Sequence, residues 1–376
     1  MFRSNSHYVR PASGAFTRRT VMALLMGCAS LGVAVLTLAD HKPNHNPGGG
    51  GGGGGGEPLA GTIYFWLGLR VDLAQMDPDG GNKTVLPVDV GGEPSRDLHG
   101  EQRWFLQLRE FVGESYPNGE VRRELFAVRE DGDENVAVQL TDQPDLEPLL
   151  VGGSVPRWGI GDVEVSWIAR RWDLNAEIVL EGGIYSAGIA FDGDGNVIGL
   201  AGQPTAPLVA GDLVVDQNGY LRPEQRSHDW SPDGTQIVYS FARGFDRQQL
   251  GIADVIGGDT SIIPTDRIAT LPVWSPDGSK IAFQSGAGNS NIATINPDGS
   301  GEKIIVRRTP RTGAGTPIWS PTGEHVIYIF FSGSVFDDAR FDLYRVTAKG
   351  GGKANLTEDL DTRTVSGTAA WPVAWR

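Results

Sequence analysis

Short apolar runs recur in the second half of the chain, and each follows a polar pentapeptide. The runs are Ile237–Ser240, Ile281–Gln284 and Val326–Ile329. The pentapeptide is Trp-Ser-Pro-Asp-Gly from Trp230 and Trp274 and Trp-Ser-Pro-Thr-Gly from Trp319, which gives spacings of 44 and 45 residues. Pro, Asp and Gly in this order favour a tight turn, and β-branched and aromatic residues favour strands. The fixed period therefore predicts an array of equivalent antiparallel sheets.

Weaker copies of the same unit fill the first half of the chain. They open at Gly61, Pro94 and Pro156, and the opening unit has no first strand. The C-terminal segment Ala370–Trp375 has the Pro and Trp of a first strand but no turn after it. We therefore expect an all-β fold over residues 57–376, a six-bladed β-propeller closed by pairing the C-terminal strand with the N-terminal blade.

The repeat resembles that of a known family. The order Trp-Ser-Pro-Asp-Gly-x-x-Ile-Ala-Phe from Trp274, followed by Asn-Ile-x-x-Ile-x-Pro-Asp-Gly from Asn291, is similar to the TolB-type, WD-like propeller repeat. The resemblance covers about residues 57–376 and implies a six-bladed propeller, a fold that serves many functions. TolB carries an α/β domain before its propeller and works with the Tol–Pal envelope machinery. Here strands are predicted directly after a glycine run, so the resemblance extends to the propeller alone.

The N-terminal segment has the three parts of an export signal. Residues 1–39 contain Arg18 and Arg19, the apolar run Val21–Leu38 and small residues before Asp40, which predicts export to the periplasm or cell envelope. A retained membrane anchor and a twin-arginine signal are the alternatives. Cys28 lies in a run that resembles a lipobox, although a signal core also accommodates a cysteine. Residues 40–56, with nine consecutive glycines, predict a flexible linker.

Net charge and composition limit the classes of partner that the chain can bind. The chain has a net charge of −14, and residues 1–39 carry four arginines and no acid, so the rest stands at −18. This balance disfavours nucleic acid and anionic lipid as partners. Beyond Cys28 there is no thiol for a disulfide or a nucleophile.

We expect no cofactor, no metal and no assigned catalytic residue. The sequence contains no Gly-x-Ser-x-Gly elbow, phosphate loop or zinc spacing. Asp192–Asn196 resembles the start of a calcium loop, but the central Gly and the final Glu of such a loop are missing.

The expected binding surface lies on one face of the ring. With strands numbered one to four from the centre, the one-to-two and three-to-four turns form a turn face, and the remaining connections form a long-loop face. The predicted long connections are residues 111–120, 143–155, 169–182, 201–225, 242–247 and 331–340. Long connections on a rigid scaffold commonly bind partners, and Trp, Tyr and Arg are frequent hot spots. The alternative is that these side chains pack the loops onto the ring. The candidates on the predicted long connections are Tyr116, Arg170, Arg171, Trp172, Tyr220, Arg222, Arg243, Phe245, Phe336, Asp337 and Arg340.

Two further groups have structural and functional interpretations. His228 replaces the Pro that precedes Trp in other units, and we consider it as a ligand or base in the central channel or as a structural histidine. The repeated tryptophans are expected to wedge between neighbouring blades, and the turn aspartates to stabilise turns. The tryptophans are Trp158, Trp230, Trp274, Trp319 and Trp375.

The sequence predicts a function only as a class. We expect an exported, monomeric, non-enzymatic binding or scaffold module of the cell envelope that engages a protein, peptide or glycan and meets the membrane only through its N-terminal segment. The alternatives are a carbohydrate-active lyase or hydrolase centred on the channel and a sensor domain. An enzyme would show acids, bases and arginines converging at the channel mouth, whereas a scaffold would show an aromatic and polar patch.

Overall fold

The computed structural model describes most of the chain beyond residue 58. The described residues are 59–67, 72–86, 93–99, 104–129, 137–149, 156–159, 163–215, 221–242, 248–286, 290–333, 339–360, 362 and 370–375. The export signal, the linker and Cys28 lie outside them and stay predictions. No helix among the described residues has the length and hydropathy needed to cross a membrane.

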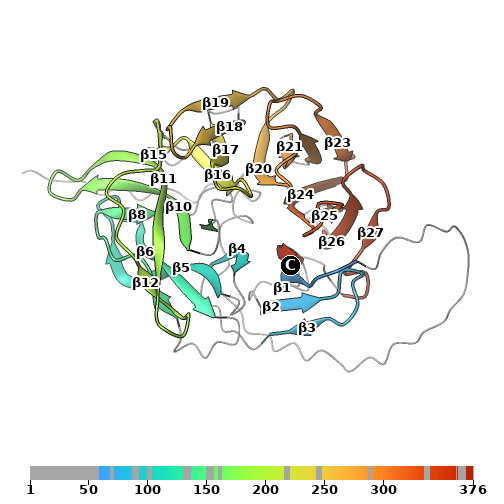
Figure 1. Ribbon diagram of the computed structural model, residues 1–376, viewed down its shortest axis with the longest axis horizontal. Helices are drawn as coiled ribbons and strands as arrows, with labels where there is room; N and C mark the ends of the chain where they lie inside the picture. The colour runs from blue at the N-terminus through green and yellow to red at the C-terminus, as the bar shows by residue number, and fades with distance from the viewer. Residues whose placement is uncertain are drawn as a thin grey trace, which may run out of the picture. The chain divides into compact units, whose positions relative to one another are not determined.

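Among the described residues, six antiparallel sheets of four or more strands follow one another around a ring (Figure 1), which confirms the six-bladed propeller. The first blade comprises β28 (Ala370–Trp375), β1 (Ile63–Leu67), β2 (Asp72–Met76) and β3 (Thr84–Val85). The second comprises β4 (Glu93–His99), β5 (Trp104–Ser115), β6 (Val121–Arg129) and β7 (Val138–Gln139). The third comprises β9 (Arg157–Trp158), β10 (Glu164–Asp173), β11 (Ile178–Phe191) and β12 (Val197–Leu200).

The remaining blades are more regular. The fourth comprises β16 (Gln225–Trp230), β17 (Gln236–Ala242), β18 (Gln248–Asp254) and β19 (Thr260–Ile263). The fifth comprises β20 (Ala269–Trp274), β21 (Ile281–Ser285), β22 (Asn291–Ile295) and β23 (Lys303–Val306). The sixth comprises β24 (Thr312–Trp319), β25 (His325–Ser332), β26 (Arg340–Thr347) and β27 (Ala354–Asn355).

The C-terminal strand closes the ring as predicted. β28 pairs antiparallel with β1, from Ile63 opposite Trp375 to Leu67 opposite Ala370. The indole of Trp375 is buried and donates a hydrogen bond of 3.1 Å to the carbonyl oxygen of Ala60. The last strand therefore completes the blade that the N-terminal strands begin.

The repeated tryptophans pack between blades, in agreement with the sequence. Trp274 shares a buried cluster with Val238 of the fourth blade and Phe283 of the fifth. Trp319 shares another with Ile292 of the fifth blade and Tyr328 of the sixth. Each tryptophan thus buries apolar area of two sheets at once. Each Å² of apolar area removed from water stabilises the fold by about 25 cal/mol.

The pentapeptide forms the predicted turn. The amide of Gly234 donates a hydrogen bond of 2.9 Å to the carbonyl of Ser231, and Gly234 has a φ of 67° that favours glycine. The hydroxyl of Ser231 and the amide of Thr235 donate to Asp233 Oδ1 at 2.6 and 3.1 Å. The hydrogen bond from Ser231 is the main reason why the pKa of Asp233 lies below its ordinary value. The aspartate is therefore a turn former, as expected.

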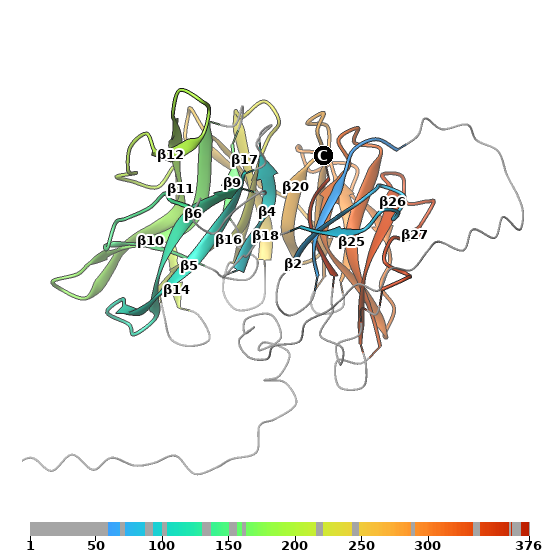
Figure 2. The same cartoon turned by 90° about the horizontal axis from the view of Figure 1, so that it is seen from below.

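The second and third blades differ from the sequence-based expectation. Residues 111–120 and 169–182 are predicted as long connections, but β5 and β6, and β10 and β11, extend through most of them as hairpins. Figure 1 shows the β10–β11 hairpin jutting out from the left of the ring, and in Figure 2 the ribbons of β5 and β10 run toward the same side.

Facing charges explain why the sequence pattern does not predict these strands. Glu110 lies opposite Arg123 and forms an ion pair of 2.7 Å with it. Arg171 lies opposite Glu181 at 3.2 Å. Cross-strand ion pairs stabilise a ribbon without hydrophobic alternation, so the sequence pattern resembles a loop.

Candidate docking surface on three hairpins

Three hairpins meet beside the second and third blades. They are β5–β6, β10–β11 and the separate hairpin of β14 (Leu213–Val215) and β15 (Leu221–Pro223). Two short strands, β8 (Leu146–Pro148) and β13 (Val209–Gly211), add to β10 and β11. A Cβ atom on Gly182 of β11 would lie 2.5 Å from Pro223 Cγ, so glycine lets β15 approach β11 closely.

Glu120 joins all three hairpins. It stands where the β5–β6 turn enters β6, and its carboxylate accepts a hydrogen bond of 2.9 Å from Arg170 Nη2 on β10. It also accepts a short hydrogen bond from Arg222 Nη2 on β15. Arg170 Nη1 donates to the carbonyl of Leu221, which ties β10 to β15 directly at 2.5 Å.

Behind Glu120 lies a second carboxylate that is fully buried. Glu147 on β8 accepts from Arg170 Nε at 2.5 Å, from Arg170 Nη2 at 2.9 Å and from the indole of Trp172 at 2.7 Å. The Arg170 guanidinium also lies 5.0 Å from the centre of the Trp172 ring. Removing one partner from such a buried pair leaves an uncompensated charge, so the pair holds the hairpins in one arrangement.

Burial and charge act differently on the two carboxylates. Burial raises the pKa of Glu147 above its ordinary value, against the opposing effect of Arg170. Burial also acts to raise the pKa of Glu120, but the hydrogen bond with Glu147 and the charges of Arg222 and Arg170 outweigh it and lower the pKa. The negative charge of the pair is therefore held most firmly on Glu120.

Tyr116 and Arg171 add to these contacts. We call the whole set of contacting side chains the brace; it consists of Tyr116, Glu120, Glu147, Arg170, Arg171, Trp172 and Arg222. The Tyr116 side chain is buried at the β5–β6 turn, and its hydroxyl donates to the carbonyl of Arg123 at 3.3 Å. Burial raises the pKa of that hydroxyl. Arg171 bridges Asp145 at 2.6 Å and Glu181 at 3.2 Å, so it ties the chain before β8 to β11.

The structure thus brings five predicted binding residues into one place. Tyr116, Arg170, Trp172 and Arg222 are buried there, and Arg171 is largely so. Their contacts brace the hairpins, the alternative that the sequence left open, and a direct role in binding stays a prediction.

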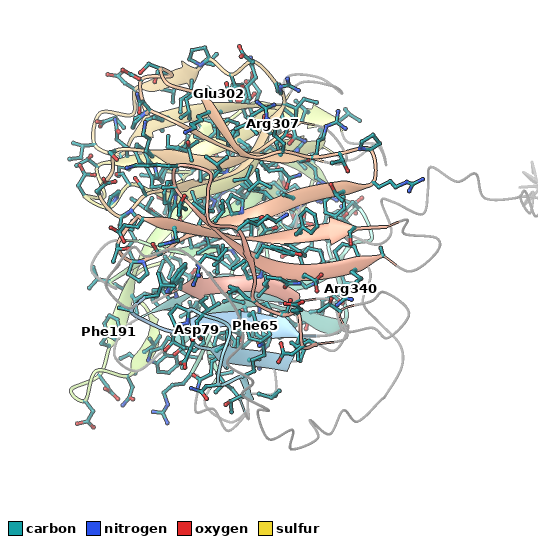
Figure 3. All side chains as sticks on the ribbon, turned by 90° about the vertical axis from the view of Figure 1, so that its right-hand side faces the viewer. Phe65, Asp79, Phe191, Glu302, Arg307 and Arg340 are labelled. Atoms are coloured by element: carbon teal, nitrogen blue, oxygen red, sulfur yellow. The ribbon has the colours of Figure 1, made fainter. Side chains whose placement is uncertain are left out.

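The other candidates do not join this group. Arg340 lies on β26 of the sixth blade, with its Nε 3.6 Å from Asp342 Oδ2. Figure 3 shows Arg340 at the opposite face of the ring from Phe191, which ends β11 at the turn into β12. Arg340 therefore lies at the long-loop face, but in the sixth blade and not on the three hairpins. Tyr220, Arg243, Phe245, Phe336 and Asp337 lie outside the described residues.

The residues that sequence reasoning missed are exposed and apolar. Large hydrophobic side chains exposed near the turns of these hairpins are Val121, Leu174, Ile178, Leu180, Val215 and Leu221. Val215 and Leu221 face each other across β14 and β15. The available signal is the run of three consecutive apolar residues Ile178–Leu180 between Glu177 and Glu181. Grouped exposed apolar side chains commonly mark protein interaction sites.

His228 lies away from this surface, at the junction of the third and fourth blades. Its Nε2 is 2.7 Å from Ser166 Oγ on β10, and the Trp230 indole donates to the same oxygen at 2.8 Å. Burial, assisted by the charge of Arg157, lowers the pKa of His228 to about 3. The imidazole is therefore neutral near pH 7 and bridges two blades, while a role as ligand or base stays a prediction.

Comparison with known proteins agrees with the ring of blades. TolB from Acinetobacter baumannii superposes with a TM-score of 0.54 at 15% identity, over 85% of this chain and 67% of that one. The fold is a TolB-like β-propeller. No family model matches the chain.

Two proteins resemble parts of the TolB-like propeller in sequence. An uncharacterized protein of Agrobacterium fabrum, Atu1656, is 32% identical over 116 residues, which are 30% of this chain and 38% of that protein. The Tol-Pal system protein TolB of Gluconobacter oxydans is 31% identical over 103 residues, 27% of this chain and 19% of that protein. The matches span less than half the length of either relative.

Proposed function

We propose that this chain is an exported, non-enzymatic scaffold of the cell envelope and that it binds a protein on the three hairpins. The observation that carries the proposal is the set of exposed apolar side chains on β5–β6, β10–β11 and β14–β15. Exposed leucine and isoleucine lose water-accessible apolar area when a partner covers them, which drives association.

The brace beneath these side chains supports the same proposal. Glu120, Arg170 and Arg222 fix the hairpins to one another before any partner arrives. A rigid surface loses little conformational entropy on binding, so more of the apolar burial remains as affinity. The predicted export signal and the likeness to a Tol-Pal system protein support an envelope location.

Site-specific photo-crosslinking in the native organism tests the proposal. A photoreactive residue at Leu180 should capture a defined envelope protein, whereas one at Ile256 should not. Ile256 is a demanding control because it is 90% exposed, but it stands in the β18–β19 turn on the turn face.

The captured protein is then purified and titrated against variants. Ile178→Ser with Leu180→Ser should weaken its binding at least tenfold, since central apolar contacts carry most of an interface's energy. Equal capture at Leu180 and Ile256, or unchanged affinity of the double variant, would overturn the proposal.

A further inference from the structure

The charges around the hairpins specify what kind of partner fits. We infer that the partner segment is basic, with lysine or arginine residues flanking the apolar side chains that meet Leu180 and its neighbours. This inference rests on the proposed function and adds the chemical class of the partner.

The arginine side chains of this region are ion-paired with neighbouring carboxylates. Arg170 and Arg222 are buried against Glu147 and Glu120. Arg122 is held by three carboxylates, those of Glu114, Glu124 and Asp142, at 2.7 to 2.9 Å. These guanidinium groups therefore present little positive charge to water.

Several carboxylates that pair with arginines on the β5–β6 hairpin are more exposed to water than the arginines. Glu110, Glu114 and Asp142 have side chains 55%, 52% and 77% exposed, while their arginine partners are at most 24% exposed. Glu177 at the β10–β11 turn and Asp212 before β14 are also exposed. Acidic groups thus border the apolar side chains on each of the three hairpins.

This arrangement selects among possible occupants. A second copy of the chain would bring a like-charged border against the first, which disfavours self-association. An anionic lipid surface is disfavoured for the same reason. A protein segment with basic residues around an apolar centre places opposite charges together and covers the apolar side chains, so it is the occupant that fits both features.

Two synthetic peptides probe this inference directly. They share alternating leucines and carry either lysine or glutamine at every other position, and a fluorescein label reports binding to the full-length protein by anisotropy. The lysine peptide should bind at least tenfold more tightly in 50 mM salt, and this advantage should shrink in 500 mM salt as charges are screened. Equal affinity of the two peptides would overturn the inference.

Matched charge variants separate local recognition from bulk charge. One triple variant neutralises the hairpin border with Glu114→Gln, Glu177→Gln and Asp212→Asn. The other removes the same charge from the turn face with Asp259→Asn, Asp298→Asn and Glu324→Gln. The first should weaken binding of the lysine peptide at least fivefold and the second less than twofold. Equal weakening by both would overturn the inference, because the attraction would then come from net charge.

The double variant Ile178→Ser with Leu180→Ser distinguishes this inference from the proposed function. If both peptides bind equally and both are lost in that variant, apolar docking stands and the basic partner is wrong. If neither peptide's affinity changes in that variant, the hairpins are not the docking surface and both ideas fail. Thermal unfolding of each variant, expected to match the unmodified protein, verifies the fold.

Discussion

The fourth to sixth blades and the second and third blades solve the same packing problem in different ways. In the regular blades, Trp230, Trp274 and Trp319 are buried against the neighbouring sheet, and short turns join the first strand to the second. In the second and third blades the inner strands pack similarly, around Trp158 and Trp167. The hairpins β5–β6 and β10–β11, however, extend beyond this core as two-stranded ribbons whose strands are linked by ion pairs.

The difference shows which part of a repeat fold can form a binding surface that the other repeats lack. Apolar side chains wedge the blades together, and their loss would affect the whole ring. The charged brace at Glu120 and Glu147 lies outside that repeat and fixes only the added hairpins. Binding is therefore expected where the repeat is extended.

The largest expected effect comes from breaking the brace. Arg170→Met removes the cation that pairs with both Glu147 and Glu120. It should lower the free energy of unfolding by about 3 to 5 kcal/mol, because a buried carboxylate is left without its cation. Urea denaturation measures the change.

Two controls sharpen this result. Arg123→Met breaks a half-exposed pair with Glu110 on the same hairpins and should cost less than about 1 kcal/mol. Adding Glu147→Met to Arg170→Met should recover most of the loss, since the buried carboxylate is removed together with its cation. An Arg170→Met protein as stable as the parent would show that the brace is dispensable.

An intermediate effect is expected at the border between the two regions. The pKa of His228 is lowered to about 3, so the folded protein keeps the imidazole neutral while the unfolded chain protonates near pH 6.5. The stabilisation is complete above pH 6.5 and falls by about 1.4 kcal/mol per pH unit as the pH drops from 6.5 toward 3.

Denaturation curves at several pH values measure this contribution. His228→Gln should show a shallower loss of stability between pH 6.5 and 5 than the parent. Identical slopes in both proteins would mean that His228 becomes protonated in the folded state and that the junction tolerates the charge.

The smallest effects belong to the turns of the regular blades. Asp277 accepts from the Ser275 hydroxyl at 2.6 Å and from the Ser279 amide at 3.0 Å. Thr322, at the same place in the third copy, makes longer hydrogen bonds of 3.2 and 3.4 Å. Asp277→Ala should lower the free energy of unfolding by about 0.5 to 1 kcal/mol, and Thr322→Asp should raise it by a few tenths of a kcal/mol.

Thermal unfolding of the two variants tests the equivalence of the turns. Opposite shifts in Tm are expected, and both should leave the hairpin surface and its binding unchanged. A stabilising Asp277→Ala would contradict the structural role of the aspartate.

The sequence determined the architecture because the repeat is local. Each of the three pentapeptide copies specifies a turn and the apolar strand directly after it, and these copies, the three weaker units and the leftover segment Ala370–Trp375 together imply a closed ring. The positions of Arg170, Trp172 and Arg222 on one side of the propeller also followed from strand order.

Only the tertiary structure decided what those side chains do. Arg170 meets Glu147, Glu120 and Leu221 from three different segments, and no local pattern encodes that convergence. The ribbons of β5–β6 and β10–β11 were missed because facing charges, such as Glu110 and Arg123, stabilise them in place of an apolar alternation. The arginines expected at the binding surface are the brace, and the exposed apolar residues beside them form the candidate surface, because buried charge needs partners that only the folded chain supplies.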